Sequence, residues 1–355
     1  MMKVDWKHLA MALAVLPFAV LLFAWIGFFN VGASSGHWKV TEWFLQLAMR
    51  SAIRTYALAV EEPARLPDAG IQPAAGHFAR GCAVCHGAPG EPRSPSVLRM
   101  LPLPPDLTKT VGEWSNAELF RLVKHGIRFT GMPAWPTQAR DDEVWAMVAF
   151  LRQLPRLDAQ RYRELAYGTP VPGGAIPRPV STLLAECARC HGSDGVGRSP
   201  LVPNLAGQSE AYLLGSLDAY AKGDRPSGIM SVPAMAITQD ERREIARYYA
   251  ELRQAPGSPR AGGDVLAGAR IVEQGQPARA VPACASCHRG EGRNPLYPAL
   301  GGQSPDYVAA QLRLFRAGSR GGSRYAHLME HIAKGLSDQD IEDVAAYYVQ
   351  SPVAD

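Results

Sequence analysis

Three copies of the pattern Cys-x-x-Cys-His constrain this chain more than any other feature of its sequence. They use all six cysteines of the 355 residues, so no cysteine remains for a structural disulfide. In this pattern the two cysteines bond covalently to a porphyrin, and the adjacent histidine becomes an axial ligand of its iron. The sequence therefore predicts three covalently bound haem c groups, held by Cys82, Cys85 and His86, by Cys187, Cys190 and His191, and by Cys284, Cys287 and His288.

Two other uses of paired cysteines fit the sequence less well. A tetrahedral zinc site takes four ligands, usually from two converging pairs, so three pairs leave one unmatched and the histidines unexplained. A thioredoxin-like redox pair needs a βαβ setting, whereas Gly- and Pro-rich loops and helical patterns flank these cysteines. The pattern favours haem attachment over both.

Composition and charge agree with small haem domains. The 34 glycines and 29 prolines suit domains whose cofactor, rather than a large side-chain core, fills the centre. Three haems would add about six propionate charges, which brings the formal balance from +4 to about −2. The basic apoprotein therefore predicts neither nucleic-acid binding nor a polybasic membrane patch.

The N-terminal segment predicts a membrane anchor. From Leu9 to Phe29 there are 21 residues without a charge, which as a helix would span about 31 Å, the thickness of a hydrocarbon core. Lys3 and Lys7 precede it and favour a cytoplasmic N-terminus. The alternative is a cleaved secretory signal ending at residues 31–33, but the apolar run exceeds the usual ~7–15 residues. We expect a single-pass protein of the bacterial cytoplasmic (inner) membrane, with its haem domains in the periplasm, where haem attachment is completed.

The remaining chain divides at changes in composition. Residues 38–60 have the pattern of an amphipathic helix, which would lie either on the membrane surface or against the first haem domain or a partner. Residues 168–179 are rich in Pro and Gly and mark the clearest boundary. The predicted divisions are an anchor over 1–35, the amphipathic helix and connector over 36–65, haem domains over 66–157, 181–256 and 257–355, and a linker over 158–180.

The second and third domains form an internal repeat. A block that follows the haem motif recurs at an offset of 95 residues, and a second block recurs at an offset of 99. The first block pairs Pro203, Leu205, Gly207, Gln208, Tyr212, Leu217, Gly223 and Arg225 with Pro298, Leu300, Gly302, Gln303, Tyr307, Leu312, Gly318 and Arg320; the second pairs Met230, Ala234, Tyr248 and Tyr249 with Met329, Ala333, Tyr347 and Tyr348.

These motifs carry a resemblance to known cytochromes. Residues 181–352 resemble the dihaem cytochromes c of the c-four family, through the haem motif, Pro-x-Leu-x-Gly-Gln, a tyrosine and Met-x-x-x-Ala. Residues 66–157 resemble a monohaem class I cytochrome c, through Gly-Met-Pro-Ala-Trp at 131–135. The resemblance implies an all-α fold of three tandem class I cytochrome c domains behind one N-terminal transmembrane helix. It also implies that the carbonyls of Pro203, Pro298 and, less closely matched, Pro105 accept a hydrogen bond from the proximal histidines.

A methionine on the far side of each iron would raise its reduction potential and close its coordination. For the first haem we expect Met132, because Pro133 presets a turn that can aim the sulfur. Met100, which precedes a Pro-rich run, and His125, in a helical pattern, are weaker rivals.

The repeat selects the other two methionines. Met230 precedes Thr238 as Met329 precedes Ser337, and both residues resemble helix caps followed three positions later by an acid. Met235 has no counterpart in the third domain, so we expect it to pack rather than ligate. His327 and His331 flank Met329 and are expected at the surface. The predicted iron ligands are therefore His86 with Met132, His191 with Met230, and His288 with Met329.

These features predict that the protein carries single electrons in a respiratory chain. It would join a dehydrogenase or quinol-oxidising complex to a terminal oxidase or soluble cytochrome, as an electron-transfer subunit rather than an enzyme. The outline resembles cytochrome subunits that accompany molybdenum or quinoprotein dehydrogenases. The alternative is a haem enzyme such as a peroxidase or thiosulfate-oxidising cytochrome, which would need an open iron site and acid–base groups beside it.

Overall fold

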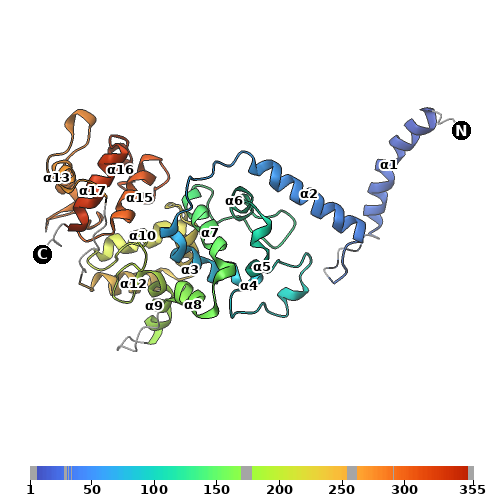
Figure 1. The fold of residues 1–355 in the computed structure, drawn as a ribbon, viewed down its shortest axis with the longest axis horizontal. Helices are drawn as coiled ribbons and strands as arrows, with labels where there is room; N and C mark the ends of the chain where they lie inside the picture. The colour runs from blue at the N-terminus through green and yellow to red at the C-terminus, as the bar shows by residue number, and fades with distance from the viewer. Residues whose placement is uncertain are drawn as a thin grey trace.

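Helices are the regular secondary structure in the part of the chain that the structure describes. The computed structural model describes residues 6–27, 30, 32, 34–168, 178–253, 262–290 and 292–350. No strand forms within these ranges, where β pairing is limited to two isolated bridges, Ala88–Glu91 and Gln276–Val281. The molecule is elongated, with the first two helices projecting at one end and the C-terminal helices at the other (Figure 1). The predicted all-α fold is confirmed.

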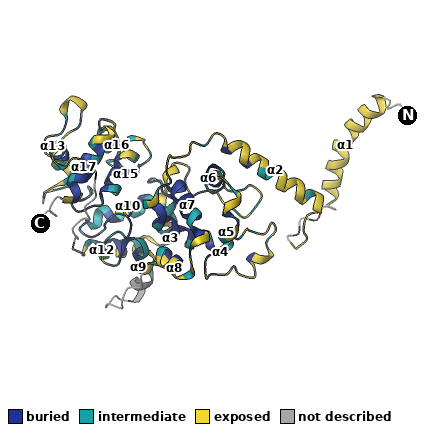
Figure 2. Ribbon diagram, in the orientation of Figure 1, coloured by how far each residue is buried: buried dark blue, intermediate teal, exposed yellow. Residues whose placement is uncertain are grey.

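Helix α1 (Trp6–Ile26) stands apart from the rest of the protein. None of its 21 residues is buried (Figure 2), and its mean hydropathy reaches 2.5 in its most apolar window. At ~1.5 Å per residue it is about 31 Å long, so its length and composition fit a membrane span. Residues 31 and 33 of the alternative cleavage site lie outside the described residues.

Helix α2 (Lys39–Ala57) has two halves with different surroundings. Its C-terminal half packs on the first haem domain through buried Ile53 and Ala57, and Arg50 pairs with Glu113 at 2.9 Å. Its N-terminal half keeps large apolar side chains exposed, namely Trp38, Val40, Trp43, Phe44, Leu45 and Leu47. The C-terminal half of the predicted amphipathic helix therefore packs on the first domain, whereas the apolar side chains of its N-terminal half stay exposed.

The first haem domain is built around two helices, α3 and α7. Helix α7 is buried along residues 143–151, because α3, α6 and the second domain cover its faces. Helix α6 starts with a capping box between Ser115 and Glu118 and ends at His125, which the sequence placed in a helical pattern. The helices are α3 (Ile71–Gly81), α4 (Ala83–His86), α5 (Leu107–Thr110), α6 (Asn116–His125), α7 (Asp141–Gln153) and α8 (Ala159–Tyr167).

Helix α8 lies within the range 158–180 that the sequence suggested as linker. Asp158 caps it by accepting from Arg161 N, and its Tyr162 and Ala166 are buried against the core of the first domain. The Pro- and Gly-rich pattern begins only at Gly168, and residues 169–177 lie outside the described residues. Helix α8, inside the predicted linker range, thus packs on α3 and on the core of the first domain, while the domain division itself stays a prediction.

The second and third domains repeat one helical arrangement. Thr238 forms a capping box with Glu241, and Ser337 and Asp340 exchange the same pair of hydrogen bonds, so both predicted caps are confirmed. The second domain contains α9 (Arg178–His191), α10 (Glu210–Lys222), α11 (Gly228–Met235) and α12 (Gln239–Ala250). The third contains α13 (Val265–Gln274), α14 (Ala285–His288), α15 (Pro305–Arg316), α16 (Ala326–Lys334) and α17 (Asp338–Gln350).

Each haem domain has its own hydrophobic cluster. Among the described residues, the cluster of the second domain contains five buried side chains: Leu184, Leu213, Ile245, Ala246 and Tyr249. A core this small cannot offset much conformational entropy, so a bound cofactor would have to complete it. The clusters of the first and third domains are larger.

The second and third domains bind each other through a reciprocal exchange by two glutamines. Gln208 bonds to both backbone groups of Ala299, at 2.8 and 2.9 Å, and Gln303 bonds to both backbone groups of Asn204, at 2.6 and 3.0 Å. The two glutamines are counterparts in the repeat, and so are the two residues they contact. The interface is therefore pseudo-symmetric, and all four hydrogen bonds of the exchange are buried.

Gln208→Leu and Gln303→Leu should destabilise the protein by similar amounts. Each change leaves a buried backbone N–H and C=O unpaired, which costs about 2–4 kcal/mol in the free energy of unfolding. Urea unfolding of the holoprotein measures this cost, and Gln160→Leu on the exposed face of α8 is the control, expected within about 0.5 kcal/mol of wild type. If both Gln208→Leu and Gln303→Leu lowered the free energy of unfolding by less than about 0.5 kcal/mol, the glutamine exchange would not hold the second and third domains together.

Candidate haem-binding sites

The three histidines of the repeated motif share one hydrogen bond. In each, Nδ1 lies against a proline carbonyl, which only accepts, so Nδ1 carries the proton and Nε2 remains available as a ligand. The distances are 2.8 Å from His86 to Pro105, 3.1 Å from His191 to Pro203 and 3.0 Å from His288 to Pro298. The three carbonyls implied by the resemblance therefore make these contacts.

Burial favours the neutral form of these imidazoles by lowering their pKa values. Desolvation lowers the pKa of His191 to about 4, against the opposing effect of the Pro203 hydrogen bond. The pKa values of His86 and His288 are lowered for the same reason. A neutral imidazole is the form that coordinates a metal.

The cysteines lie beside the histidines on short helical turns. Cys85 is on α4, Cys187 and Cys190 are in the last turns of α9, and Cys287 is on α14. Burial raises the pKa of the Cys82 and Cys187 thiols to about 12, which is the opposite of a reactive thiolate. Among the described residues, no group of three or more His, Cys, Asp and Glu side chains is placed to hold a metal ion.

Unpartnered buried atoms near the motifs fit a bound porphyrin. Orphaned buried polar atoms are rare in native proteins. Here the Tyr348 hydroxyl and Arg293 Nε are buried without a hydrogen-bond partner. Tyr348 shares a core cluster with Cys284, and the charge of Arg293 acts on His288. The residues present therefore fit a haem at the third motif, where its edge and propionates would provide the missing neighbours.

The predicted ligand of the first haem lies in a loop that backbone bonds hold. Met132 N donates to Thr130 Oγ1 at 3.1 Å, and Ile127 N donates to the Met132 carbonyl at 3.2 Å. The Met100 methyl group lies so near Gly131 that a Cβ there would approach it to 2.9 Å. Both sulfurs are thus close to this loop, whereas His125 is exposed. Met132 stays a prediction that the geometry supports.

The second and third predicted methionines are on helices that follow the repeat. Met230 is half-buried in the first turn of α11, with its N–H donated to Ser227 Oγ at 3.0 Å. Met235, at the end of the same helix, is 67% exposed. Met329 packs on the core of the third domain, while His327 and His331 are exposed. These positions support Met230 and Met329 over their rivals.

Helix α3 of the first domain lies directly on the second attachment motif. Gln72 Nε2 donates to Arg189 O at 3.1 Å and is 3.7 Å from Cys190 Sγ, and a Cβ on Gly76 would be 3.3 Å from the same sulfur. Arg80 forms an ion pair with Glu186 across this contact. The sequence did not reveal the contact, because it joins residues more than 100 positions apart.

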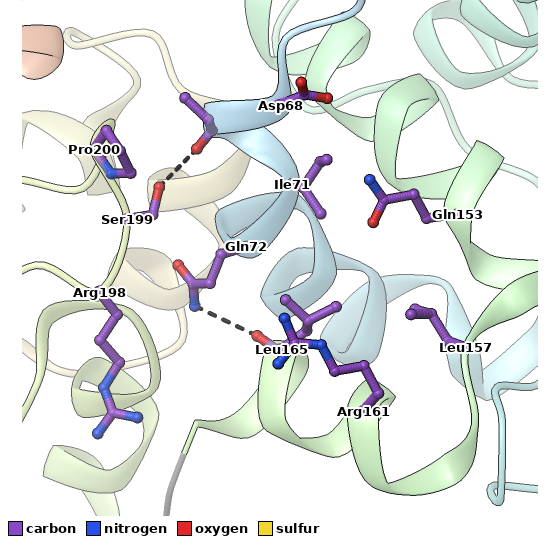
Figure 3. Close-up of a pocket in the computed structure, with 11 residues that line it drawn as sticks. Asp68, Ile71, Gln72, Gln153, Leu157, Arg161, Leu165, Arg198, Ser199 and Pro200 are labelled. Carbon is purple, nitrogen blue, oxygen red and sulfur yellow. Dashed lines mark hydrogen bonds between the residues drawn. The ribbon is translucent and has the colours of Figure 1, made fainter. Parts of the chain in front are cut away.

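A cleft of about 300 Å³ opens beside this contact. Figure 3 shows it between α3, α8 and the loop that carries Arg198 and Ser199, with Gln72 bonded to the Leu165 carbonyl. Ser199 Oγ donates to the Ala69 carbonyl at 2.7 Å and closes one side. The first and second domains therefore meet through polar contacts with backbone as well as through apolar packing.

An all-helical chain with repeated attachment motifs and carbonyl-fixed histidines defines a c-type cytochrome. Residues 69–151 match the family model of "Cytochrome C oxidase, cbb3-type, subunit III", and residues 179–251 and 266–351 match that of "Cytochrome c". The chain belongs to the cytochrome c family: it is a multihaem, cytochrome c4-like electron-transfer cytochrome with covalently bound haem c.

Curated relatives match about half of this chain. The thiosulfate dehydrogenase electron acceptor of Stutzerimonas stutzeri is 35% identical over 182 residues, covering 50% of this chain and 81% of the relative. Cytochrome c4 of Pseudomonas aeruginosa is 35% identical over 167 residues, covering 46% of this chain and 82% of the relative. The solved cytochrome c4 of Acidithiobacillus ferrooxidans is 32% identical with a TM-score of 0.42, covering 46% of this chain and 98% of that one.

Met230→Ala should remove the sulfur–iron charge-transfer band of one haem and lower the midpoint potential of that haem, because the thioether favours the ferrous state. Met235→Ala is the matched control on the same helix and should leave bands and potentials unchanged. Optical redox titration of both variants measures the difference. An unaltered titration of Met230→Ala, or an equal effect of Met235→Ala, would contradict the assignment.

Proposed function

We propose that this protein is a membrane-anchored, periplasmic trihaem cytochrome that transfers single electrons. The observation that carries the proposal is the threefold recurrence of one site: a cysteine pair, a histidine and a proline carbonyl that fixes its imidazole. When bound, haem c supplies one-electron redox chemistry at each site. The residues that would hold it are the six cysteines, with His86 and Met132, His191 and Met230, and His288 and Met329 as iron ligands.

The chain's own contacts support transfer along the row of domains. Helix α3 touches both attachment motifs, because it ends at Cys82 and packs on Cys190. The glutamine exchange between Gln208 and Gln303 holds the second domain against the third. These protein contacts hold each haem-attachment site next to the following one. This arrangement favours the passage of an electron from one site to the next.

The N-terminal helices support a membrane location. Helix α1 would cross the cytoplasmic membrane once, with Lys3 and Lys7 on the cytoplasmic side. The exposed half of α2 would lie on the periplasmic surface of the same membrane, where Trp38 and Trp43 would enter the headgroup region. The haem domains would then sit close to membrane-bound partners.

The relatives support a dehydrogenase as the electron donor. Two of them are named thiosulfate dehydrogenase electron acceptors, and a solved structure that matches is titled as a thiosulfate dehydrogenase. We propose that this chain is the cytochrome subunit of a dehydrogenase complex and passes electrons to a terminal oxidase or soluble cytochrome. A quinol-oxidising complex is the other donor consistent with a membrane location.

Purification from membranes in mild detergent tests this role. We expect the protein to co-elute with a larger catalytic subunit and its haems to be reduced when that subunit receives its substrate. A variant with residues 1–35 replaced by a cleavable export signal should appear in the soluble fraction and still be reduced. Repeated isolation as a free monomer that no dehydrogenase reduces would contradict the proposal.

A further inference from the structure

A buried carboxylate of the first domain lies at the boundary with the second. Glu143 is on α7 and is 6% exposed. Its Oε1 accepts from Ser227 Oγ at 2.6 Å, and its Oε2 accepts from Gly228 N at 2.6 Å and Ile229 N at 3.4 Å. All three donors belong to the second domain, so one side chain of the first domain binds the start of a helix in its neighbour.

That helix is α11, which carries Met230. Ser227 is its N-cap, and the Ser227 hydroxyl accepts from Met230 N at 3.0 Å while it donates to Glu143. The first N–H groups of a helix have no partner within the helix, and a carboxylate near them is favoured by the helix dipole. Glu143 and Ser227 together satisfy the N–H groups of the first three residues of α11.

The same carboxylate also holds the loop that follows Met132. Trp135 Nε1 donates to Glu143 Oε2 at 3.3 Å, and Arg140 pairs with Oε1 at 3.0 Å. The indole packs so tightly on Gly228 that a Cβ there would come within 2.1 Å of Nε1. Every hydrogen-bond neighbour of Glu143 is a donor, which favours an acceptor-only carboxylate, although burial raises the pKa of Glu143 against the opposing effects of Arg140, Ser227 and Gly228.

The described part of the third domain has no such device. In the repeat, Ala326 takes the place of Ser227, and α16, which carries Met329, has Tyr325 as its N-cap residue and no side-chain cap bond. Among the described residues, a carboxylate of the first domain thus bonds to the start of the helix that carries Met230, whereas the helix that carries Met329 has no side-chain cap bond. The third haem site therefore serves as an internal control for effects of Glu143 on the second.

We propose that Glu143 is a positioning residue that the first domain supplies to the second haem site. It holds the start of α11 so that Met230 faces the iron, and it joins this helix to the loop of Met132. The potential of the second haem therefore depends on the first domain. The proposal rests on the proposed ligation by Met230.

Glu143→Gln in the full-length holoprotein tests this role. One carboxylate oxygen becomes an amide donor that faces other donors, so α11 loses part of its anchorage. We expect the fraction of second haem without sulfur ligation to rise about tenfold or more, the effect of losing a hydrogen bond to a charged group. The midpoint potential of that haem should fall, while that of the third haem should stay as in wild type. The affected haem is identified as the one whose sulfur–iron band disappears in Met230→Ala.

Asp142→Asn is the matched control. Asp142 also pairs with Arg140, at 2.7 Å, and the change removes the same charge one position earlier without touching α11. It should leave the three potentials unchanged. Glu143→Asp, which keeps an acceptor-only group, should shift the second haem less than Glu143→Gln.

Three results would overturn the proposal. Potentials and bands of Glu143→Gln that equal those of Asp142→Asn would show that the carboxylate does not position Met230. Equal shifts at the second and third haems would show a general loss of stability. If Met230→Ala itself altered no haem, the proposed ligand would fall together with this inference; if Met230→Ala acted and Glu143→Gln did not, only the inference would fall.

Discussion

The hydrogen bond from each proximal histidine to a proline carbonyl is the constraint on which the sites depend. Covalent attachment through cysteines fixes where a porphyrin is held, but it does not fix the imidazole plane. The carbonyls of Pro105, Pro203 and Pro298 do so, because they select the tautomer that leaves Nε2 available. The bond recurs in all three domains even though the rest of the first domain differs from the repeat.

The domains are joined by polar side chains that bind backbone groups of a neighbour. Gln208 and Gln303 do this symmetrically between the second and third domains. Glu143 does it asymmetrically between the first and second domains, where one carboxylate serves a helix start and an indole. Such bonds demand a fixed relative orientation, because an unpaired buried polar group is costly. A rigid row of sites is what short-range electron transfer requires.

Local patterns in the sequence predicted local structure well. The caps at Thr238 and Ser337 and the helical fold itself depend on residues a few positions apart. The packing of α8, inside the predicted linker range, could not be foreseen, because its Tyr162 and Ala166 join the core of the first domain and its Leu165 carbonyl contacts Gln72, 93 positions away in the chain. The domain boundaries and the methionine ligands stay predictions.

The role of Glu143 could not be read from the chain alone. On sequence grounds it belongs to the periodic face of a helix, and its partners Ser227 and Gly228 lie 84 and 85 positions later. An acid within an otherwise apolar helix face, three positions after Arg140, was the available signal. Its partners became visible only once the two domains were in contact.

Intact-mass spectrometry of the mature polypeptide, combined with alkylation of free thiols, tests the central claim most directly. The account predicts the added mass of three haem groups and no cysteine open to alkylation, because all six would be in thioether bonds. A mass without added haem, or thiols that react freely at any of the three motifs, would contradict it.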